Sequence, residues 1–182
     1  MTIDNVIDPM VRPAFPQPAY PTAALPVATF DDAMQLHFNG ELIDLKHFGP
    51  AHTAGDVAVF FRAHNAVHMG DVFTPGGYPF IDADNGGDID GMIAFCRAVL
   101  AELDPDAIVI PGHGPISAYA DLARYADMLE SVRDRVAALV AEGASLEQVI
   151  AAQPTKEWDA DYGDPLRMID RAYATLAAGD TE

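Results

Sequence analysis

The chain has 182 residues, half of them hydrophobic, which suits one globular domain with a sizeable core and excludes a disordered chain. Its 28 acidic and 10 basic side chains give a formal net charge of −18. Because so acidic a surface repels phosphate backbones, we expect no nucleic-acid partner. The single cysteine, Cys96, rules out an internal disulfide and leaves the redox compartment open.

The sequence gives no sign of a membrane partner. No stretch approaches the roughly 20 apolar residues that span a bilayer. The N-terminus lacks the basic start and apolar middle of a signal peptide. Localisation stays open: the cytoplasm is the default, but a missing N-terminal segment could have carried a signal.

Residues 1–26 are rich in proline, with six prolines between Pro9 and Pro26. Proline fixes φ and removes an amide donor, so this stretch should be irregular or polyproline-like. We interpret it as a linker or surface arm. The change of pattern at Val27 indicates a single domain over residues 27–182.

Strand signals come first along the chain. Residues 34–38 and 41–45 alternate apolar and polar side chains around Asn39-Gly40, the strongest short signal for a β-hairpin. Residues 57–61, 66–69 and 107–110 are short apolar runs typical of buried strands. Pro111-Gly112 ends the last of them.

Helix signals dominate the rest. Residues 89–103 have apolar side chains at helical spacing, with Asp88 placed to cap the first turn. A long helix is predicted over 117–142, ending at Gly143. Ser145 to Gln148 has the spacing of a capping box, and Asp164-Pro165 opens a final helix. The fold class is α/β, with helices covering one side of the strands.

Three short turns carry the residues that point to chemistry. They are residues 51–56, 69–71 and 111–115, and each directly follows or precedes a predicted strand. Strand ends bring side chains from distant parts of a sequence to one edge of a sheet. Imidazole and carboxylate are ligands for a divalent transition metal such as zinc, and the neighbouring glycines allow close approach.

The ordered set of these turns is more specific than any one of them. His-Thr-x-Gly-Asp from His52, Met-Gly-Asp ending at Asp71, and Ile-Pro-Gly-His-Gly-Pro around His113 together resemble the second half of the metallo-β-lactamase superfamily. The resemblance covers residues 27–115 and, more loosely, the long helix that follows. It implies the C-terminal half of a four-layer αββα sandwich: one mixed sheet covered by helices.

The resemblance also implies a site and a reaction. His52 would ligate a first zinc ion, Asp71 would bridge two ions as the catalytic carboxylate, and His113 would ligate the second ion. A metal-activated hydroxide would attack a small-molecule ester, thioester or amide-type bond. Thr53 and Asp56 would orient His52, unless they form only an ordinary turn.

The sequence departs from the family at one motif. His-x-His-x-Asp-His, which supplies the other metal ligands, does not occur in this chain. His64 and His68 lie four apart in a turn and strand, so we interpret them as structural. Each metal would keep about half of its protein ligands, and we expect one weakly held zinc ion or none.

Three functions therefore remain open: a truncated and impaired metal-dependent hydrolase, an inactive fragment, and a half-enzyme whose partner chain supplies the first metal motif. Without a second sheet, the apolar face of strands such as 57–61 is uncovered. That face would favour a homo-oligomer or docking of a separate N-terminal half. The substrate itself is not indicated.

The loop at residues 73–82 is rich in Gly, Pro and aromatic side chains. We predict that it lines the substrate pocket, with Tyr78 and Phe80 as apolar contacts. The alternative is an ordinary crossover into the helix at 89–103.

Overall fold

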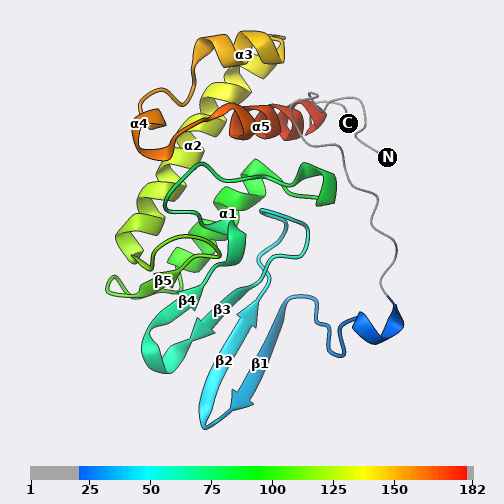
Figure 1. The fold of residues 1–182 in the computed structure, drawn as a ribbon, viewed down its shortest axis with the longest axis vertical. Coiled ribbons are helices and arrows are strands. Elements are labelled where there is room, and N and C mark those ends of the chain that lie inside the picture. Colours follow the sequence, from blue (N-terminus) through cyan, green and yellow to red (C-terminus); the bar gives the residue numbers. More distant parts are fainter. Residues whose placement is uncertain (1–20, 180–182) are drawn as a thin grey trace.

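The computed structural model describes residues 21–179, which form a six-stranded mixed sheet with helices on one side (Figure 1). The strands lie in sequence order, and every neighbouring pair is antiparallel except β4 and β5, which are parallel. Their bounds are β1 Ala33–Phe38, β2 Glu41–Lys46, β3 Ala58–Phe61, β4 Ala66–His68, β5 Ile108–Ile110 and β6 Ser117–Ala118. The α/β prediction is confirmed.

Local signals explain most of the elements. Asn39 and Gly40 adopt φ of 53° and 81°, the positive values that a tight two-residue hairpin turn requires, so β1 and β2 pair as predicted. Asp88 accepts a hydrogen bond from the Gly91 amide at 2.7 Å and caps the first turn of α1. Ser145 and Gln148 form the predicted capping box of α3.

The helices differ from the predicted ranges mainly at their ends. Residues 117–118 form the short strand β6 instead of opening the long helix. The α-helices are α1 Ile89–Leu100, α2 Tyr119–Ala141, α3 Leu146–Ala152, α4 Asp159–Tyr162 and α5 Leu166–Gly179. The 3₁₀ turns are η1 Thr22–Ala24, η2 Arg62–His64, η3 Gly70–Val72 and η4 Ala83–Asn85. None of the helices within residues 21–179 is long and apolar enough to cross a bilayer.

The predicted Pro-rich arm, residues 1–26, falls mostly outside the described residues. Its division from the domain at 27–182 stays a prediction.

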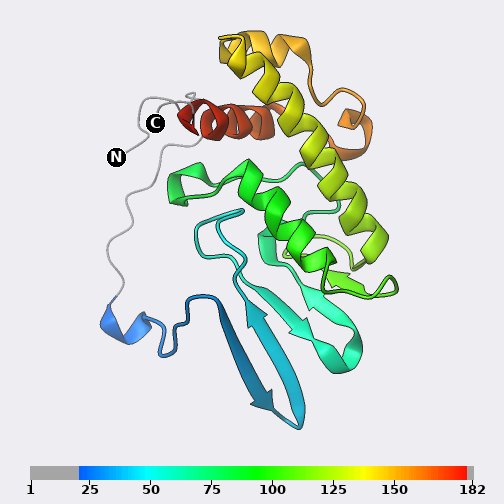
Figure 2. The ribbon, with the colours of Figure 1, turned by 180° about the vertical axis from the view of Figure 1, so that it is seen from behind.

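The core lies between the sheet and the helices. Phe60, Val67 and Val109 occupy the same face of neighbouring strands and are at most 1% exposed. They belong to one hydrophobic cluster with side chains of α1 and α2 such as Phe95 and Leu122. Figure 2 shows these two helices in front of the strands. Burial of this cluster stabilises the fold through the apolar surface removed from water.

The opposite face of the sheet, called here the open face, is also apolar. The strand register places on it Met34, Leu36, Phe38, Ile43, Leu45, Val59, Phe61, Ala66, Ile108 and Ile110, together with two polar residues, Glu41 and His68. Leu36, Phe38 and Ile108 are 41%, 64% and 44% exposed. No helix of the described part covers this face (Figures 1 and 2). The uncovered apolar face predicted from the sequence is therefore present in residues 21–179.

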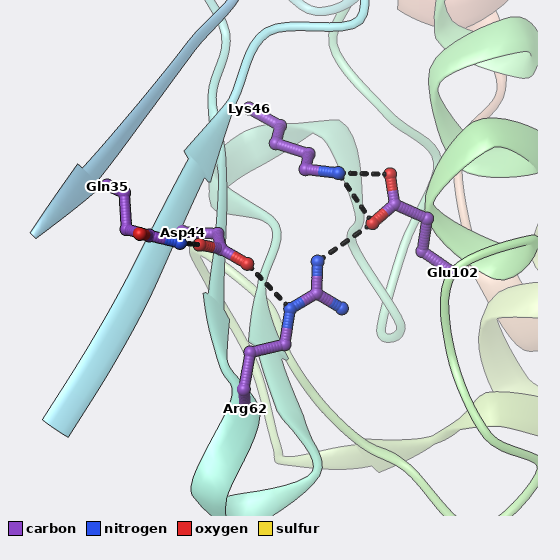
Figure 3. Close-up of polar contacts among 5 residues, drawn as sticks. All are labelled: Gln35, Asp44, Lys46, Arg62 and Glu102. Atoms are coloured by element: carbon purple, nitrogen blue, oxygen red, sulfur yellow. Dashed lines mark hydrogen bonds and ion pairs between the residues drawn. The ribbon is translucent and has the colours of Figure 1, made fainter.

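A polar network on the helix side fixes the orientation of the hairpin (Figure 3). Lys46 and Arg62 both bind the Glu102 carboxylate, at 2.7 and 2.8 Å, just after α1. Arg62 also donates from Nε to Asp44 at 2.8 Å, and Asp44 accepts a second bond from Gln35. The hairpin thus turns its polar side toward the helices and its apolar side toward the open face.

This network predicts a loss of stability in acid. Hydrogen bonds from Gln35 and Arg62 lower the pKa of Asp44 below its ordinary 3.8, and those from Lys46 and Arg62 lower the pKa of Glu102 below 4.5 despite the opposing effect of its burial. Carboxyl groups with lowered pKa stabilise the fold above their ordinary values, and this contribution is lost as the pH falls through the lowered ones. Urea unfolding between pH 7 and 3 should show the decline below about pH 4.5.

The variant Glu102→Gln should reduce that pH dependence, because it removes one of the two carboxyl groups. Asp104→Asn, an exposed acid in the same turn, is the matched control and should leave the profile unchanged. Equal pH slopes for Glu102→Gln and the unmodified chain would contradict a role for this network.

Candidate metal centre

The three predicted ligands converge at one end of the sheet. Asp71 lies on η3, directly after β4, and His113 follows β5 by three residues. The parallel pairing of these strands continues beyond their ends, since the Met69 amide donates to Ile110 at 2.9 Å and the Gly112 amide to Gly70 at 2.7 Å. This continued pairing brings the two loops together.

Asp71 stands between the two histidines. Its Oδ2 lies 3.8 Å from His52 Nε2, and its Oδ1 lies 3.5 Å from His113 Nε2. The His52 side chain is 18% exposed and that of His113 is 81% exposed. One carboxylate thus offers one oxygen to each imidazole. The three side chains come from three loops, which follow one another in the sequence at intervals of about 20 and 40 residues.

The orientation of His52 is fixed by a backbone carbonyl. Its Nδ1 lies 2.6 Å from the carbonyl oxygen of Phe80, which can only accept a hydrogen bond. Nδ1 therefore carries a proton, and the ring is oriented with Nε2 toward Asp71. Metal-bound histidines normally need such a partner on the second ring nitrogen.

Thr53 and Asp56, predicted to orient His52, bind each other. The Thr53 amide donates to Asp56 Oδ2 at 2.7 Å, and the Thr53 hydroxyl lies 3.2 Å from Oδ1. They close the turn that carries His52, while Phe80 holds the ring itself. Sequence reasoning missed this partner because a carbonyl oxygen is common to every residue type.

The loop that carries His52 is fastened to the segment before α1. The Asp82 amide donates to the His52 carbonyl and the Ala54 amide to the Asn85 carbonyl, both at 2.9 Å. Gly87 allows this contact, because a Cβ there would lie 2.2 Å from the His52 carbonyl oxygen.

Gly112 allows an equally close contact beside Asp71. A Cβ on Gly112 would lie 2.1 Å from Asp71 Oδ1 and 2.7 Å from the Gly70 carbonyl carbon. The glycine in Pro-Gly-His-Gly-Pro therefore makes room for the carboxylate between the two imidazoles.

The donor spacing tests whether the implied zinc fits. Two ligand atoms held about 2.1 Å from one ion at a tetrahedral angle lie roughly 3.4 Å apart. The His52–Asp71 and Asp71–His113 separations of 3.8 and 3.5 Å are close to this value. Among residues 21–179, however, no group of three or more His, Cys, Asp and Glu side chains could hold one ion together. The residues fit two adjacent partial sites that share Asp71, with two protein ligands for each ion.

The two aromatic residues predicted to contact substrate have other contacts. The Tyr78 hydroxyl donates to the Thr155 carbonyl and to Asp159, at 3.1 and 2.9 Å. Burial and the Asp159 carboxylate raise the pKa of Tyr78 well above its ordinary value, so the hydroxyl remains a donor. The Phe80 ring lies beside His52, with the Arg167 guanidinium 4.6 Å from its centroid. Their role toward substrate stays a prediction.

The histidines interpreted as structural have partners of their own. His64 pairs with Glu41 at 2.9 Å, and His68 Nδ1 accepts a hydrogen bond from the Gly70 amide at 3.2 Å. His68 thereby supports the turn that carries Asp71. Neither contact points to metal binding.

The sheet, its helical layer and the loops at its strand ends define a metallo-β-lactamase-type fold, of which this chain has part. A metallo-β-lactamase from Pontibacter korlensis is 20% identical, with a TM-score of 0.51 over 58% of this chain and 49% of that one. A double mutant of the sec-alkyl sulfatase PisA1 is 12% identical, with a TM-score of 0.66 over 87% of this chain and 27% of that one.

A structure of TTHA1623 in a di-iron-bound form is 30% identical, with a TM-score of 0.47 over 58% of this chain and 50% of that one. The chain spans about half the length of the metallo-β-lactamases it matches. Comparison with protein-family models and with curated protein sequences gave no match. The comparisons confirm the predicted fold.

Proposed function

We propose that this chain carries part of the active site of a metal-dependent hydrolase, which acts on a small-molecule ester, thioester or amide-type bond. One observation carries the proposal: the Asp71 carboxylate faces a ring nitrogen of His52 with one oxygen and a ring nitrogen of His113 with the other. Imidazole and carboxylate donors at this spacing suit zinc, and also iron or manganese. The fold of the relatives is consistent with this assignment.

When bound, a divalent metal ion lowers the pKa of water toward neutrality and polarises the bond to be cut. The chain's own residues supply the proposed ligands and orient them. The contact between His52 Nδ1 and the Phe80 carbonyl fixes the ring so that Nε2 faces Asp71. Asp71 contributes the negative charge and links the two partial sites, and Gly112 leaves the space it needs.

The first test is zinc binding by the metal-stripped chain, measured by calorimetry and elemental analysis. We expect weak binding, because each ion finds only two protein ligands here instead of the three of a catalytic zinc site. Asp71→Asn should weaken zinc binding more than His52→Ala or His113→Ala, since only Asp71 belongs to both pairs.

The matched control is His37→Ala, an exposed histidine on β1 that should not alter zinc affinity. If Asp71→Asn binds zinc as tightly as the unmodified chain, the proposed centre is wrong.

A second candidate function is a half-enzyme, in which a separate chain covers the open face and supplies the remaining ligands. Three observations favour it: the apolar open face, the 81% exposure of His113, and the match to about half the length of the relatives. A covering sheet would bury apolar surface and bring further donors to the exposed imidazole.

Assays of the zinc-loaded chain on ester, thioester and lactam panels separate the two candidates. Turnover by the chain alone favours the first. Bound zinc without turnover favours the second.

A further inference from the structure

Arg171 is a buried charge on α5, far along the chain from the proposed ligands. Its side chain is only 1% exposed, although arginine is rarely buried so completely. The position would suit an apolar side chain, since Met168 and Ala172 on the same helix belong to the hydrophobic cluster. Replacing a buried ion pair by apolar residues of similar volume is often neutral or stabilising, so stability alone does not account for this arginine.

The pairing of the Arg171 guanidinium is incomplete. Its Nη1 lies 3.4 Å from Asp84 Oδ2, and its Nε lies 3.3 Å from Asp170 Oδ2 without the geometry of a hydrogen bond. Within residues 21–179, neither Nε nor Nη2 has a hydrogen-bond partner. Buried polar groups are normally satisfied, so a guanidinium kept here at this cost points to a role beyond packing.

The contacts of Arg171 lead back to the metal centre. Arg171 and Arg167 lie one helical turn apart, with their guanidinium carbons 5.8 and 4.6 Å from the centroid of the Phe80 ring. Both distances are within the range of cation–π attraction. Asp84 lies on η4, and α5 packs beside this turn (Figures 1 and 2). Arg171 thus contacts the segment 80–85 at its start and near its end.

That segment is bonded to the loop of His52 at three points. The Phe80 carbonyl lies 2.6 Å from His52 Nδ1, and the two rings meet edge to face at a centroid distance of 6.1 Å. The Asp82 amide donates to the His52 carbonyl, and the Ala54 amide donates to the Asn85 carbonyl. Any displacement of the segment therefore moves the imidazole.

We propose that Arg171 is a positioning residue of the metal centre. It binds Asp84 and faces the Phe80 ring, and it thereby holds the segment 80–85 where the Phe80 carbonyl keeps the His52 imidazole in place. Its importance for metal binding rests on the proposed function, whereas its effect on the orientation of the imidazole does not.

The experiment measures proton exchange at the histidine ring nitrogens by NMR, in the metal-free chain labelled with ¹⁵N at histidine. Two ring protons are bonded alike: His52 Nδ1 lies 2.6 Å from the Phe80 carbonyl oxygen, and His47 Nδ1 lies 2.7 Å from that of Asp56. Arg171→Met keeps a long side chain and removes the charge. It should speed exchange of the His52 ring proton about tenfold and leave that of His47 unchanged.

His47 serves as the internal reference, because a general loss of stability would expose both ring protons alike. Equal acceleration at His47 and His52 would therefore overturn the proposal, as would unchanged exchange at His52 in Arg171→Met. The matched control is Arg135→Met, which removes another arginine that pairs with a carboxylate and lies over an aromatic ring. It should leave both exchange rates unchanged.

Two further variants test the contacts separately and keep the experiment decisive if Arg171→Met does not fold. Phe80→Leu keeps the carbonyl and removes the ring, and Asp84→Asn removes an ion-pair partner whose side chain is 39% exposed. Each should speed exchange at His52 about threefold, as expected for the loss of one cation–π contact or one ion pair. No acceleration in either variant would overturn the proposal.

Zinc titration of the same samples separates this inference from the proposed function. Arg171→Met should weaken zinc binding roughly tenfold, as is typical when a residue that orients a metal ligand is lost. Faster exchange at His52 in a chain that binds no zinc supports the positioning role and removes the metal-dependent hydrolase. Zinc binding that depends on Asp71, with unchanged exchange at His52 in Arg171→Met, overturns the positioning role alone.

Discussion

Gly112→Ala should abolish zinc binding and lower the melting temperature by about 5 °C. The new Cβ would lie 2.1 Å from Asp71 Oδ1 and 2.9 Å from the Gly70 carbonyl oxygen, so the carboxylate and the paired loops must separate. Inserting a methyl group where nothing can yield costs about 1–3 kcal/mol, and roughly 1 kcal/mol corresponds to 2–4 °C in a chain of this size. Thermal unfolding and zinc calorimetry measure the two effects.

Gly55→Ala is the matched control for this substitution. Gly55 lies in the loop that carries His52, has no atom within 4 Å of its Cβ position and does not adopt a positive φ. It should keep both the melting temperature and the zinc affinity of the unmodified chain. A Gly112→Ala chain that binds zinc normally would show that the loops around Asp71 yield freely.

The double substitution Leu36→Lys and Phe38→Lys should weaken self-association by at least about 100-fold. Both side chains lie on the open face, and burial of a large apolar side chain contributes about 1.5–3 kcal/mol. We expect the unmodified chain to associate through this face at high concentration, despite its net charge. Sedimentation equilibrium over a range of concentrations measures the constants.

Leu42→Lys is the control for the open face. Leu42 is 36% exposed on β2, but it lies on the opposite side of the same hairpin. It should leave association unchanged, and none of these substitutions should alter the fold. A monomeric unmodified chain at all concentrations would contradict association of copies and leave a different covering chain as the occupant of the open face.

The fold could be predicted where the signals are local. Asn39-Gly40 specifies its own turn, and Asp88 and Ser145 cap the helices that follow them. Among the strands and α-helices of residues 21–179, two short elements were missed, β6 and α4. Strand β6 exists because Ser117 pairs with Val109, a tertiary contact that a helical pattern over 117–142 does not reveal.

The site could be predicted in part for a similar reason. The convergence of His52, Asp71 and His113 follows from their places at strand ends, and their order along the chain carries the resemblance. The Phe80 carbonyl could not be predicted, because a backbone acceptor leaves no mark in a sequence. The contact between the Tyr78 and Tyr162 rings was missed since it depends on how α4 packs.

The hydrogen bond from His52 to the Phe80 carbonyl has a consequence for how this protein can be engineered. The segment that supplies this carbonyl, residues 73–80, begins two residues after Asp71 and so connects two of the proposed ligands. Insertions or deletions in this segment would therefore release the imidazole as well as displace the carboxylate. Libraries for directed evolution should keep this segment at its present length, so that His52 and Asp71 keep their relative orientation.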